Sequence, residues 1–295
     1  MRIFFSPCRA LSFRIEWKRA WVMVEALDLV EKLRIRPGER IRLSDRDPRD
    51  KCGLAAKEEA EALTRTYAQE IDTLQDHLYA EGRRALLVIL QGTDTSGKDG
   101  TIRSVFNATG PLGVSVTAFR QPSEIELAHD YLWRVHAVCP RRGTIGIFNR
   151  SHYEEVLVAK VRGFAPKEEI EQRYEQINAF EKILVENGTT ILKFMLHISK
   201  DEQAERLQER LDNPEKHWKF SAGDLDDRKH WDEFQEAYEI MLNRCSTPWA
   251  PWHVIPADRK WVRNATIASI VKATLETMDP RYPEVSWNPA DFKIS

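Results

Sequence analysis

The sequence predicts an α/β fold built on a parallel sheet of about five strands flanked by helices. Short, continuous apolar runs recur along the chain, as is typical of strands that are buried on both faces. Segments with helical spacing lie between these runs, and they are long enough for the right-handed crossovers that join parallel strands. A chain of 295 residues is sufficient for one large core with small appendages.

Each predicted element follows from its own pattern. The five apolar runs that we predict as strands are 85–91, 115–119, 144–149, 191–199 and 252–257. Helical patterns occur roughly at 55–80, 98–108, 124–138, 151–160, 167–187, 200–211 and 259–277. The first helix presents one apolar face and is expected to end at Gly82, since glycine commonly closes helices.

The chain divides into three predicted regions. Residues 1–54 form an N-terminal arm, 55–285 form the domain, and 286–295 form a C-terminal tail. Within the arm, the polar stretch 36–53 contains prolines and glycines and is predicted to be exposed. Residues 1–22 lack the apolar stretch and cleavage site of a secretory signal. A transit peptide stays open, but we favour a segment that is not native or not ordered, with Met23 as the true first residue.

One segment departs from the alternation of strands and helices. Residues 203–247 contain no strand-like run, and Asn213-Pro214 and 221–223 interrupt their helical pattern. Two or more helices joined by turns are therefore expected before the last strand. Such an excursion is typical of a lid in phosphate-handling enzymes, whereas ordinary packing helices would give the same pattern. The pattern alone leaves both interpretations open.

Composition excludes several classes of protein. The formal net charge is −2, which makes a nucleic-acid-binding protein a poor fit and requires any bound polyanion to meet a local basic patch. No run approaches the ~18 apolar residues of a membrane span. The four cysteines contain no CxxC pair, so that we expect reduced thiols in a cytoplasmic protein; they are Cys8, Cys52, Cys139 and Cys245.

The stretch GTDTSGKDG, residues 92–100, lies between a predicted strand and a predicted helix. This context is what a phosphate-binding loop requires. Backbone N–H groups of the turn and the positive end of the helix dipole face the anion, and Lys98 adds a full charge. The predicted phosphate- and nucleotide-binding residues of the loop are Gly92, Thr93, Thr95, Ser96, Gly97, Lys98, Asp99 and Gly100.

Two carboxylates in this loop need an explanation, because phosphates repel them. A divalent cation between Asp94 and the phosphates would remove the repulsion, and Mg²⁺ commonly takes one or two carboxylates together with phosphate oxygens. Asp94 is therefore a predicted metal ligand. Asp99 replaces the usual Ser or Thr after the lysine. We assign it a structural role, because an acid in the first turn of a helix is favourable on its own.

The stretch TIGIFNRSHYEEV, residues 144–156, is the second informative motif. A strand that ends in a polar residue suits the carboxyl edge of the sheet, where ligands of open α/β sheets bind. We predict Asn149 and Glu154 as metal ligands, with Glu155 as an alternative to Glu154, and Arg150 as a bidentate phosphate contact. The predicted catalytic residues are Asp94, Lys98, Arg150 and Glu154.

These groups are the equipment of phosphoryl transfer, in which catalysis is positioning and charge stabilisation. Apart from His152, no general base is evident, which favours a phosphate acceptor over a hydroxyl. Six further basic residues are predicted phosphate contacts, with ion pairing inside helices as the alternative for those near acids; they are Arg103, Arg134, Arg206, Arg210, Lys216 and Lys219.

Five stretches together resemble the polyphosphate kinase 2 family. They are LQGTDTSGKDGTIRSVF, PSEIELAHDYLWRVH, GIFNRSHYEEVLV, ILKFMLHISKDEQAERLQERLDNPEKHWKFS and WAPWHVIPADRKWVRN. The likeness covers about residues 55–280, and the FNRSHYEE form is similar to the branch that acts on nucleoside mono- and diphosphates. Residues 1–22 lie outside it.

The resemblance implies a P-loop kinase-like core with a helical lid over about 203–247. It implies Mg²⁺-dependent, reversible transfer of a terminal phosphoryl group from inorganic polyphosphate to ADP, AMP or guanine equivalents, with Mn²⁺ as an alternative ion. It also implies a homo-oligomer, a tetramer or dimer. Two rival hypotheses are an ATP-dependent small-molecule kinase on the same scaffold and a nucleotide-binding protein without catalytic activity.

Overall fold

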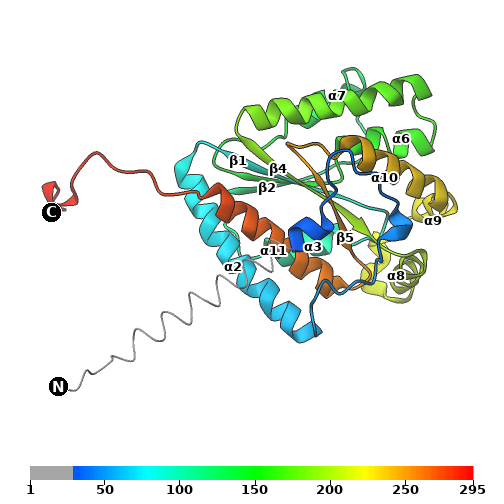
Figure 1. Cartoon of the computed structure of the whole chain (residues 1–295), viewed down its shortest axis with the longest axis horizontal. Coiled ribbons are helices and arrows are strands. Elements are labelled where there is room, and N and C mark those ends of the chain that lie inside the picture. The colour runs from blue at the N-terminus through cyan, green and yellow to red at the C-terminus, as the bar shows by residue number, and fades with distance from the viewer. Residues whose placement is uncertain (1–28, 295) are drawn as a thin grey trace.

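A parallel five-stranded sheet forms the centre of the computed structural model, which describes residues 29–294 (Figure 1). The strands are β1 (Ala85–Gln91), β2 (Val114–Ala118), β3 (Ile145–Asn149), β4 (Thr189–His197) and β5 (Trp252–Pro256). Their order across the sheet is β2-β3-β1-β4-β5. The α/β fold class is confirmed, and every predicted strand end lies within two residues of the observed one. The prediction made for residues 1–22 lies outside the described residues.

Helices cover both faces of the sheet, and this explains the apolar character of the strands. On one face pack α2 (Lys57–Glu81), α3 (Lys98–Val105) and α11 (Lys260–Met278). The other face is covered by α6 (Val158–Val161), α7 (Lys167–Glu186) and α10 (Trp231–Cys245). All seven residues of β1 are buried between these two layers. A strand without an exposed face must be apolar on both sides, which is why the strand runs do not alternate.

Two predicted helices differ in the structure. Residues 124–138 form two single turns, α4 (Glu124–Leu127) and α5 (Trp133–His136), rather than one helix. Residues 151–160 form a 3₁₀ turn, η2 (His152–Glu155), followed by α6. Within this second segment His152, Tyr153, Val156 and Leu157 are all buried. The side chains of the adjacent residues His152 and Tyr153 both contact the buried carboxylate of Glu181, and this anchor holds the backbone as a 3₁₀ turn.

The segment between β4 and β5 is helical, as predicted. It comprises α8 (Lys200–Asp212), η3 (Pro214–Lys219), α9 (Ala222–Lys229) and α10. Side-chain caps explain both interruptions: Asn213 accepts a hydrogen bond from the Glu215 N–H at 3.0 Å, and Ser221 accepts one from the Gly223 N–H at 3.2 Å. The helices α8 and α9 lie at the carboxyl end of the sheet, and α10 then covers one of its faces (Figure 1).

The N-terminal arm was predicted to be exposed over 36–53, and this is wrong for its apolar side chains. Ile41 and Leu43 are 6% and 2% exposed. The Ile41 N–H donates to Asn243 Oδ1 at 2.8 Å, and the Leu43 N–H donates to Glu239 Oε1 at 2.7 Å. The short 3₁₀ turn η1 (Leu43–Asp45) follows. The arm therefore packs on α10, because its few apolar residues are spaced to reach the core.

The arm also adds to the sheet at its outer edge. Arg34 forms an antiparallel bridge with His253 of β5. The Ile35 N–H donates to the Trp252 carbonyl at 2.8 Å, and the Ile35 side chain is fully buried. The boundaries predicted for the arm, the domain and the tail stay predictions.

Two predictions from composition concern the whole chain. Within residues 29–294, no helix combines the length and the apolar character that a membrane span requires. In the same part of the chain Cys52, Cys139 and Cys245 are all free thiols.

Candidate functional site

The glycine-rich loop lies at the centre of the sheet's carboxyl edge. It follows β1, which is flanked on its two sides by β3 and β4. Leu90, the penultimate residue of β1, is level with Asn149 at the end of β3. The loop therefore meets the segments that follow its neighbouring strands, which is the location of ligand sites in open α/β sheets.

The loop turns sharply before α3, and Gly97 makes this turn. Gly97 has a φ of +102°, and a Cβ at this position would lie 1.8 Å from Nη1 of Arg263. The Arg263 guanidinium thus covers the turn, and it donates to the Ser96 carbonyl at 3.0 Å. Only glycine fits both the backbone conformation and the space beneath this guanidinium.

Lys98 begins α3, and its side chain folds back over the loop. The Nζ group donates to the Gly92 carbonyl at 2.7 Å and to the Thr93 carbonyl at 3.2 Å. Burial, and then the positive charge of Arg150, lower the pKa of Lys98 to about 8. Burial, and then Arg206, lower the pKa of Arg263 to about 9. Both cations lack sufficient counter-charge, and a bound anion would supply it.

The two predicted motifs meet across the loop. Arg150 forms an ion pair with Asp94. Glu154 accepts a hydrogen bond from Nε2 of Gln91 at 2.9 Å, and Asn149 donates to Asp99 at 2.6 Å. The bond from Asn149 agrees with a structural role for Asp99. The structure thus brings together all four predicted catalytic residues, because the Lys98 pKa also responds to Asp94 and Glu154.

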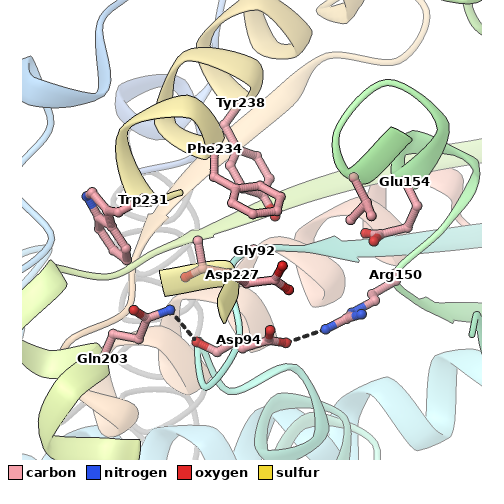
Figure 2. A pocket seen from close by; sticks show the side chains of 11 residues that line it. Gly92, Asp94, Arg150, Glu154, Gln203, Asp227, Trp231, Phe234 and Tyr238 are labelled. Carbon is pink, nitrogen blue, oxygen red and sulfur yellow. Dashed lines mark hydrogen bonds and ion pairs between the residues drawn. The ribbon is translucent and has the colours of Figure 1, made fainter. Parts of the chain in front are cut away.

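A small pocket lies between the loop and α10 (Figure 2). Its volume is about 30 Å³, enough for about one water-sized group. Its carboxylates are Asp94, Glu154 and Asp227. Aromatic side chains of α10 close the opposite wall; they are Trp231, Phe234 and Tyr238. Three acids and one arginine, Arg150, therefore share a small space.

A much larger cleft opens on the other side of the Asp94–Arg150 pair. Its volume is about 650 Å³. Nine basic side chains line it: Lys98, Arg120, Arg150, Arg206, Arg210, Lys216, Lys219, Lys260 and Arg263. Four acids also line it: Asp94, Asp99, Glu209 and Asp224. On a chain with a net charge of −2, this is the local basic patch that binding of a polyanion requires.

Not every predicted phosphate contact lines this cleft. Arg103 is exposed on α3 and lines neither cavity. Arg134 donates to the Arg120 carbonyl at 2.9 Å and lies 3.8 Å from Glu155, so it supports the loop after β2. Conversely, Arg120, Lys260 and Arg263 line the cleft but were not among the predicted site residues. Arg120 directly follows the apolar run 115–119, and this is a signal that could have found it. Lys260 and Arg263 lie in α11, and no local pattern marks them.

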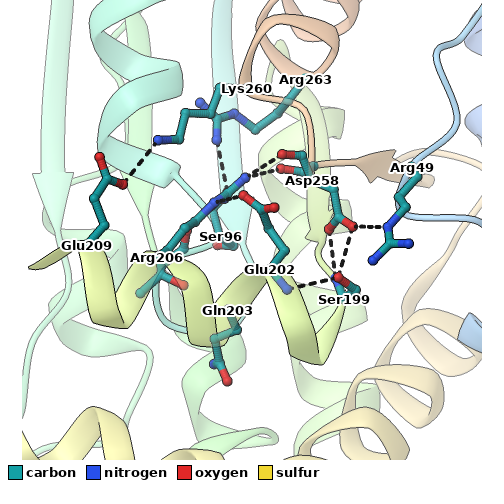
Figure 3. A network of polar contacts seen from close by, with 12 residues as sticks. Arg49, Ser96, Ser199, Glu202, Gln203, Arg206, Glu209, Asp258, Lys260 and Arg263 are labelled. Atoms are coloured by element: carbon teal, nitrogen blue, oxygen red, sulfur yellow. Dashed lines mark hydrogen bonds and ion pairs between the residues drawn. The ribbon is translucent and has the colours of Figure 1, made fainter.

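Arg206 lines the cleft but uses its donors elsewhere (Figure 3). Its Nη1 donates to the carbonyls of Thr95 and Ser96, at 2.9 and 3.2 Å. Its Nη2 donates to the carbonyls of Ala257 and Asp258, at 2.6 and 2.8 Å, and its Nε donates to Glu202. All five N–H groups therefore have acceptors. Arg206 ties the loop after β1 to the loop after β5.

We expect Arg206→Met to lower the free energy of unfolding by about 3 kcal/mol, because buried carbonyls lose a charged partner. Arg210 offers the matched control on the same helix. It pairs with Asp224 at 2.7 Å at the wall of the cleft. Arg210→Met should change the unfolding free energy by less than about 1 kcal/mol and raise the KM for an anionic substrate. Urea unfolding of both variants measures this difference, and equal stabilities would contradict the role given to Arg206.

The helical segment between β4 and β5 contributes acids as well as bases. Burial, and then the charge of Asp94, raise the pKa of Asp224 to about 6. Asp226 and Asp227 both pair with Arg162, the residue after α6, at 2.5 Å for Asp226. Burial is the main cause that raises the pKa of Asp227, and Asp94 adds to it. Carboxylates of α9 thus face Asp94 across the mouth of the loop.

The donor set of the small pocket fits a hard divalent cation. Carboxylate oxygens are ligands that Mg²⁺ prefers. The negative charge of Asp94 also raises the pKa of Asp227, so a cation between the two carboxylates would relieve their repulsion. In the described part of the chain, no three His, Cys, Asp or Glu side chains converge closely enough to hold a metal ion by themselves. An ion here would therefore complete its shell with phosphate oxygens. Of the predicted ligands, Asp94 and Glu154 line this pocket, whereas Asn149 lines the large cleft.

Comparisons with known proteins agree on one kind of relative. The family model described as Polyphosphate kinase 2 (PPK2) matches residues 54–283. An AMP/ADP-polyphosphate phosphotransferase of Meiothermus ruber is 51% identical over 257 residues, covering 86% of this chain and 96% of that protein. An ADP-polyphosphate phosphotransferase of Rhodopseudomonas palustris is 40% identical over 268 residues, covering 87% and 93%. The crystal structure of polyphosphate kinase 2 from Arthrobacter aurescens superposes with a TM-score of 0.86 at 41% identity, covering 89% of this chain and 94% of that one.

Proposed function

The chain belongs to the polyphosphate kinase 2 family, and from this we propose that it transfers the terminal phosphoryl group of inorganic polyphosphate to ADP and AMP, or to their guanine equivalents. The resemblance predicted from the motifs is thereby confirmed. Relatives named for both AMP and ADP, and for ADP alone, support both acceptors. The reaction is reversible, because one phosphoanhydride bond replaces another.

The observation that carries this proposal is the basic cleft beside Lys98. Its nine cations exceed its four carboxylates, and it is about 650 Å³ in volume. A linear polyanion can lie along this basic cleft, with its terminal phosphate at the glycine-rich loop. A neutral acceptor such as a sugar would not require this surplus of positive charge.

The chemistry needs little beyond positioning. The bond between the terminal phosphorus and its bridging oxygen breaks, and an acceptor phosphate oxygen forms the new bond. This oxygen is already ionised near neutral pH, so no base must remove a proton. His152 does not supply one, because this first residue of η2 is buried and lines neither cavity. Lys98 and Arg150 would stabilise the charge on the transferred group and hold it in line.

A divalent cation is part of the proposal. Asp94 and Glu154 would hold Mg²⁺, or Mn²⁺ in its place, and the ion would neutralise the phosphate charge that these carboxylates otherwise repel. Asn149 would orient groups on the cleft side of the same edge. Arg150, which pairs with Asp94, lines both cavities and would keep the carboxylate aimed at their boundary.

A direct assay tests the function. Purified protein with polyphosphate, Mg²⁺ and either ADP or AMP should form ATP or ADP, with no other phosphate donor present. Crossing AMP, ADP, GMP and GDP against the donor measures the acceptor preference. No nucleotide product in any combination would overturn the proposal. Consumption of ATP that requires a hydroxyl acceptor and ignores polyphosphate would instead identify a small-molecule kinase.

The lowered pKa of Lys98 predicts how donor affinity depends on pH. The free protein loses this proton near pH 8, and a bound polyanion raises the pKa by favouring the charged form. The affinity for polyphosphate is therefore highest below pH 8, where Lys98 is charged in the free protein. Above pH 8 the affinity weakens by up to about tenfold per pH unit. The KM for polyphosphate between pH 6.5 and 9.5 measures this dependence. A KM that stays constant up to pH 9.5 would contradict it.

The proposal for assembly rests on the resemblance, and the proposal for location rests on the scattered cysteines without a CxxC pair. We propose a homo-oligomer, either a tetramer or a dimer, in the cytoplasm. Light scattering measures the oligomeric state directly, and a monomer at micromolar concentration would remove that part of the proposal.

A further inference from the structure

A fully buried ionic cluster lies beneath the turn η2 that carries the second motif. Its centre is the ion pair between Lys193 of β4 and Glu181 of α7, whose Nζ and Oε2 atoms are 2.6 Å apart. Both side chains are 0% exposed. Neither residue lines a cavity of the site. The proposed reaction does not use this ion pair. Burial of two charges in the core nevertheless costs desolvation free energy, so the pair calls for an explanation.

Every donor and acceptor of the pair is used, and Tyr153 of η2 is the common partner. The three N–H groups of Lys193 are matched by Glu181, by the Tyr153 hydroxyl at 2.8 Å and by the Cys245 carbonyl at 2.8 Å. The Tyr153 hydroxyl in turn donates to Oε1 of Glu181 at 2.8 Å. Nε2 of His152 lies 3.4 Å from the same oxygen. Two adjacent residues of η2 are thus fixed by one buried carboxylate.

The turn that this cluster holds is unusual in its backbone. Arg150 precedes it with a φ of +62°, a left-handed conformation that non-glycine residues seldom adopt. Such a conformation persists only where the surroundings over-determine it. Ser151 adds a cap by accepting from the Tyr153 N–H at 3.2 Å. Arg150 and Glu154, the two functional residues of the motif, lie on either side of the anchored pair His152 and Tyr153.

Stability alone is a weak reason for such a cluster. Apolar side chains of similar volume commonly replace a buried ion pair without loss of stability, because desolvation of the two charges offsets their attraction. Directional hydrogen bonds to one carboxylate also fix the orientation of the side chains that donate them. The residues held here are the immediate neighbours of Arg150 and Glu154.

We propose that Lys193, Glu181 and Tyr153 are positioning residues that fix η2, so that Arg150 reaches Asp94 and Glu154 reaches Gln91. This role rests on the proposed phosphotransferase function, because it acts through two residues of that site. The three residues line neither cavity of the site. Loss of the cluster therefore lowers the turnover number while leaving the basic cleft, and with it donor binding, unchanged.

The first test removes one hydroxyl. Tyr153→Phe keeps the ring but deletes the bond to each partner of the ion pair, and kcat should fall about 10- to 100-fold with the KM for polyphosphate unchanged within about twofold. Tyr174→Phe is the matched control. The Tyr174 hydroxyl is also buried, on the same helix as Glu181, but it has no hydrogen-bond partner within residues 29–294. This control should retain the kcat of the unmodified chain.

The second test separates positioning from folding. The double variant Glu181→Met with Lys193→Met removes both charges and keeps the volume, so it should still fold, with a lower Tm because the Tyr153 hydroxyl and the Cys245 carbonyl lose their partners. It should lose kcat about as much as Tyr153→Phe. A double variant that folds and turns over at the original rate would overturn the proposal. So would an equal loss in Tyr174→Phe.

Hydrogen–deuterium exchange distinguishes failure of this inference from failure of the function. Amides of residues 150–155 should exchange faster in Tyr153→Phe and in the double variant, whether or not substrate is present. If the unmodified chain has no polyphosphate-dependent activity, the proposed function is lost but this measurement still tests the anchoring of the turn. Unchanged exchange in both variants would exclude the anchoring role.

Discussion

Lys98→Met is expected to lower kcat by at least about a thousandfold while the protein stays folded, because it removes the one positive charge that the loop itself provides. Lys98 is 8% exposed and its pKa is lowered by burial, so its charge costs free energy in the free protein. Methionine has a similar length and no charge. The variant should therefore unfold at the same temperature within a few degrees, whereas the transition state loses its nearest cation.

The measurement is the rate of ATP formation from ADP and polyphosphate, with circular dichroism as the check on folding. Lys182→Met is a suitable control, because this lysine is 54% exposed on α7 and pairs only weakly with Glu186 at 3.7 Å. It should retain the full rate. If Lys98→Met kept more than a tenth of the original kcat, the loop would have no direct part in the reaction.

Removal of divalent cations is expected to abolish turnover, to below about a thousandth of the original rate. The reason is the crowding of Asp94, Glu154 and Asp227 around a pocket of about 30 Å³. Phosphates placed beside these carboxylates would be repelled without an ion between them. Protein treated with EDTA should be inactive and should recover when Mg²⁺ is added back, with Mn²⁺ as a second ion to compare.

A variant connects this requirement to a residue. Asp94→Asn should raise the Mg²⁺ concentration at half-maximal rate and lower kcat, because one negative ligand is lost. Asp201→Asn serves as the control, since Asp201 is exposed in the first turn of α8. Full activity after chelation, or an unchanged Mg²⁺ dependence in Asp94→Asn, would exclude the cation from the site described here.

The strands could be predicted because the sheet is buried on both faces. A run such as ALLVILQ is apolar throughout, as a strand buried on both faces must be, and Ala85–Gln91 was predicted to the residue. Segment 151–160 could not be predicted in the same way. Its path depends on a buried anchor supplied by Glu181 and Lys193, which lie 26 or more positions away from Glu155 along the chain.

The site was only partly visible in the sequence, for a similar reason. The loop and the FNRSHYEE stretch are local motifs, and both lie where the motifs predict. Arg263 and Asp227 come from helices whose approach to the loop is decided by strand order, so spacing along the chain does not reveal them. Arg206 and Arg210 share a helix, yet only the packing of the loops after β1 and β5 decides that the first is saturated by carbonyls.

The contact between the arm and β5 has a consequence for solubility. A strand at the margin of a sheet exposes unpaired N–H and C=O groups, which are a template for pairing with other molecules. Here the Ile35 N–H donates a hydrogen bond to the Trp252 carbonyl, and Arg34 forms a β-bridge with His253. A truncated form that begins at residue 54 would uncover this margin together with the apolar surface beneath Ile41, and it should aggregate at concentrations at which the intact polypeptide stays dispersed.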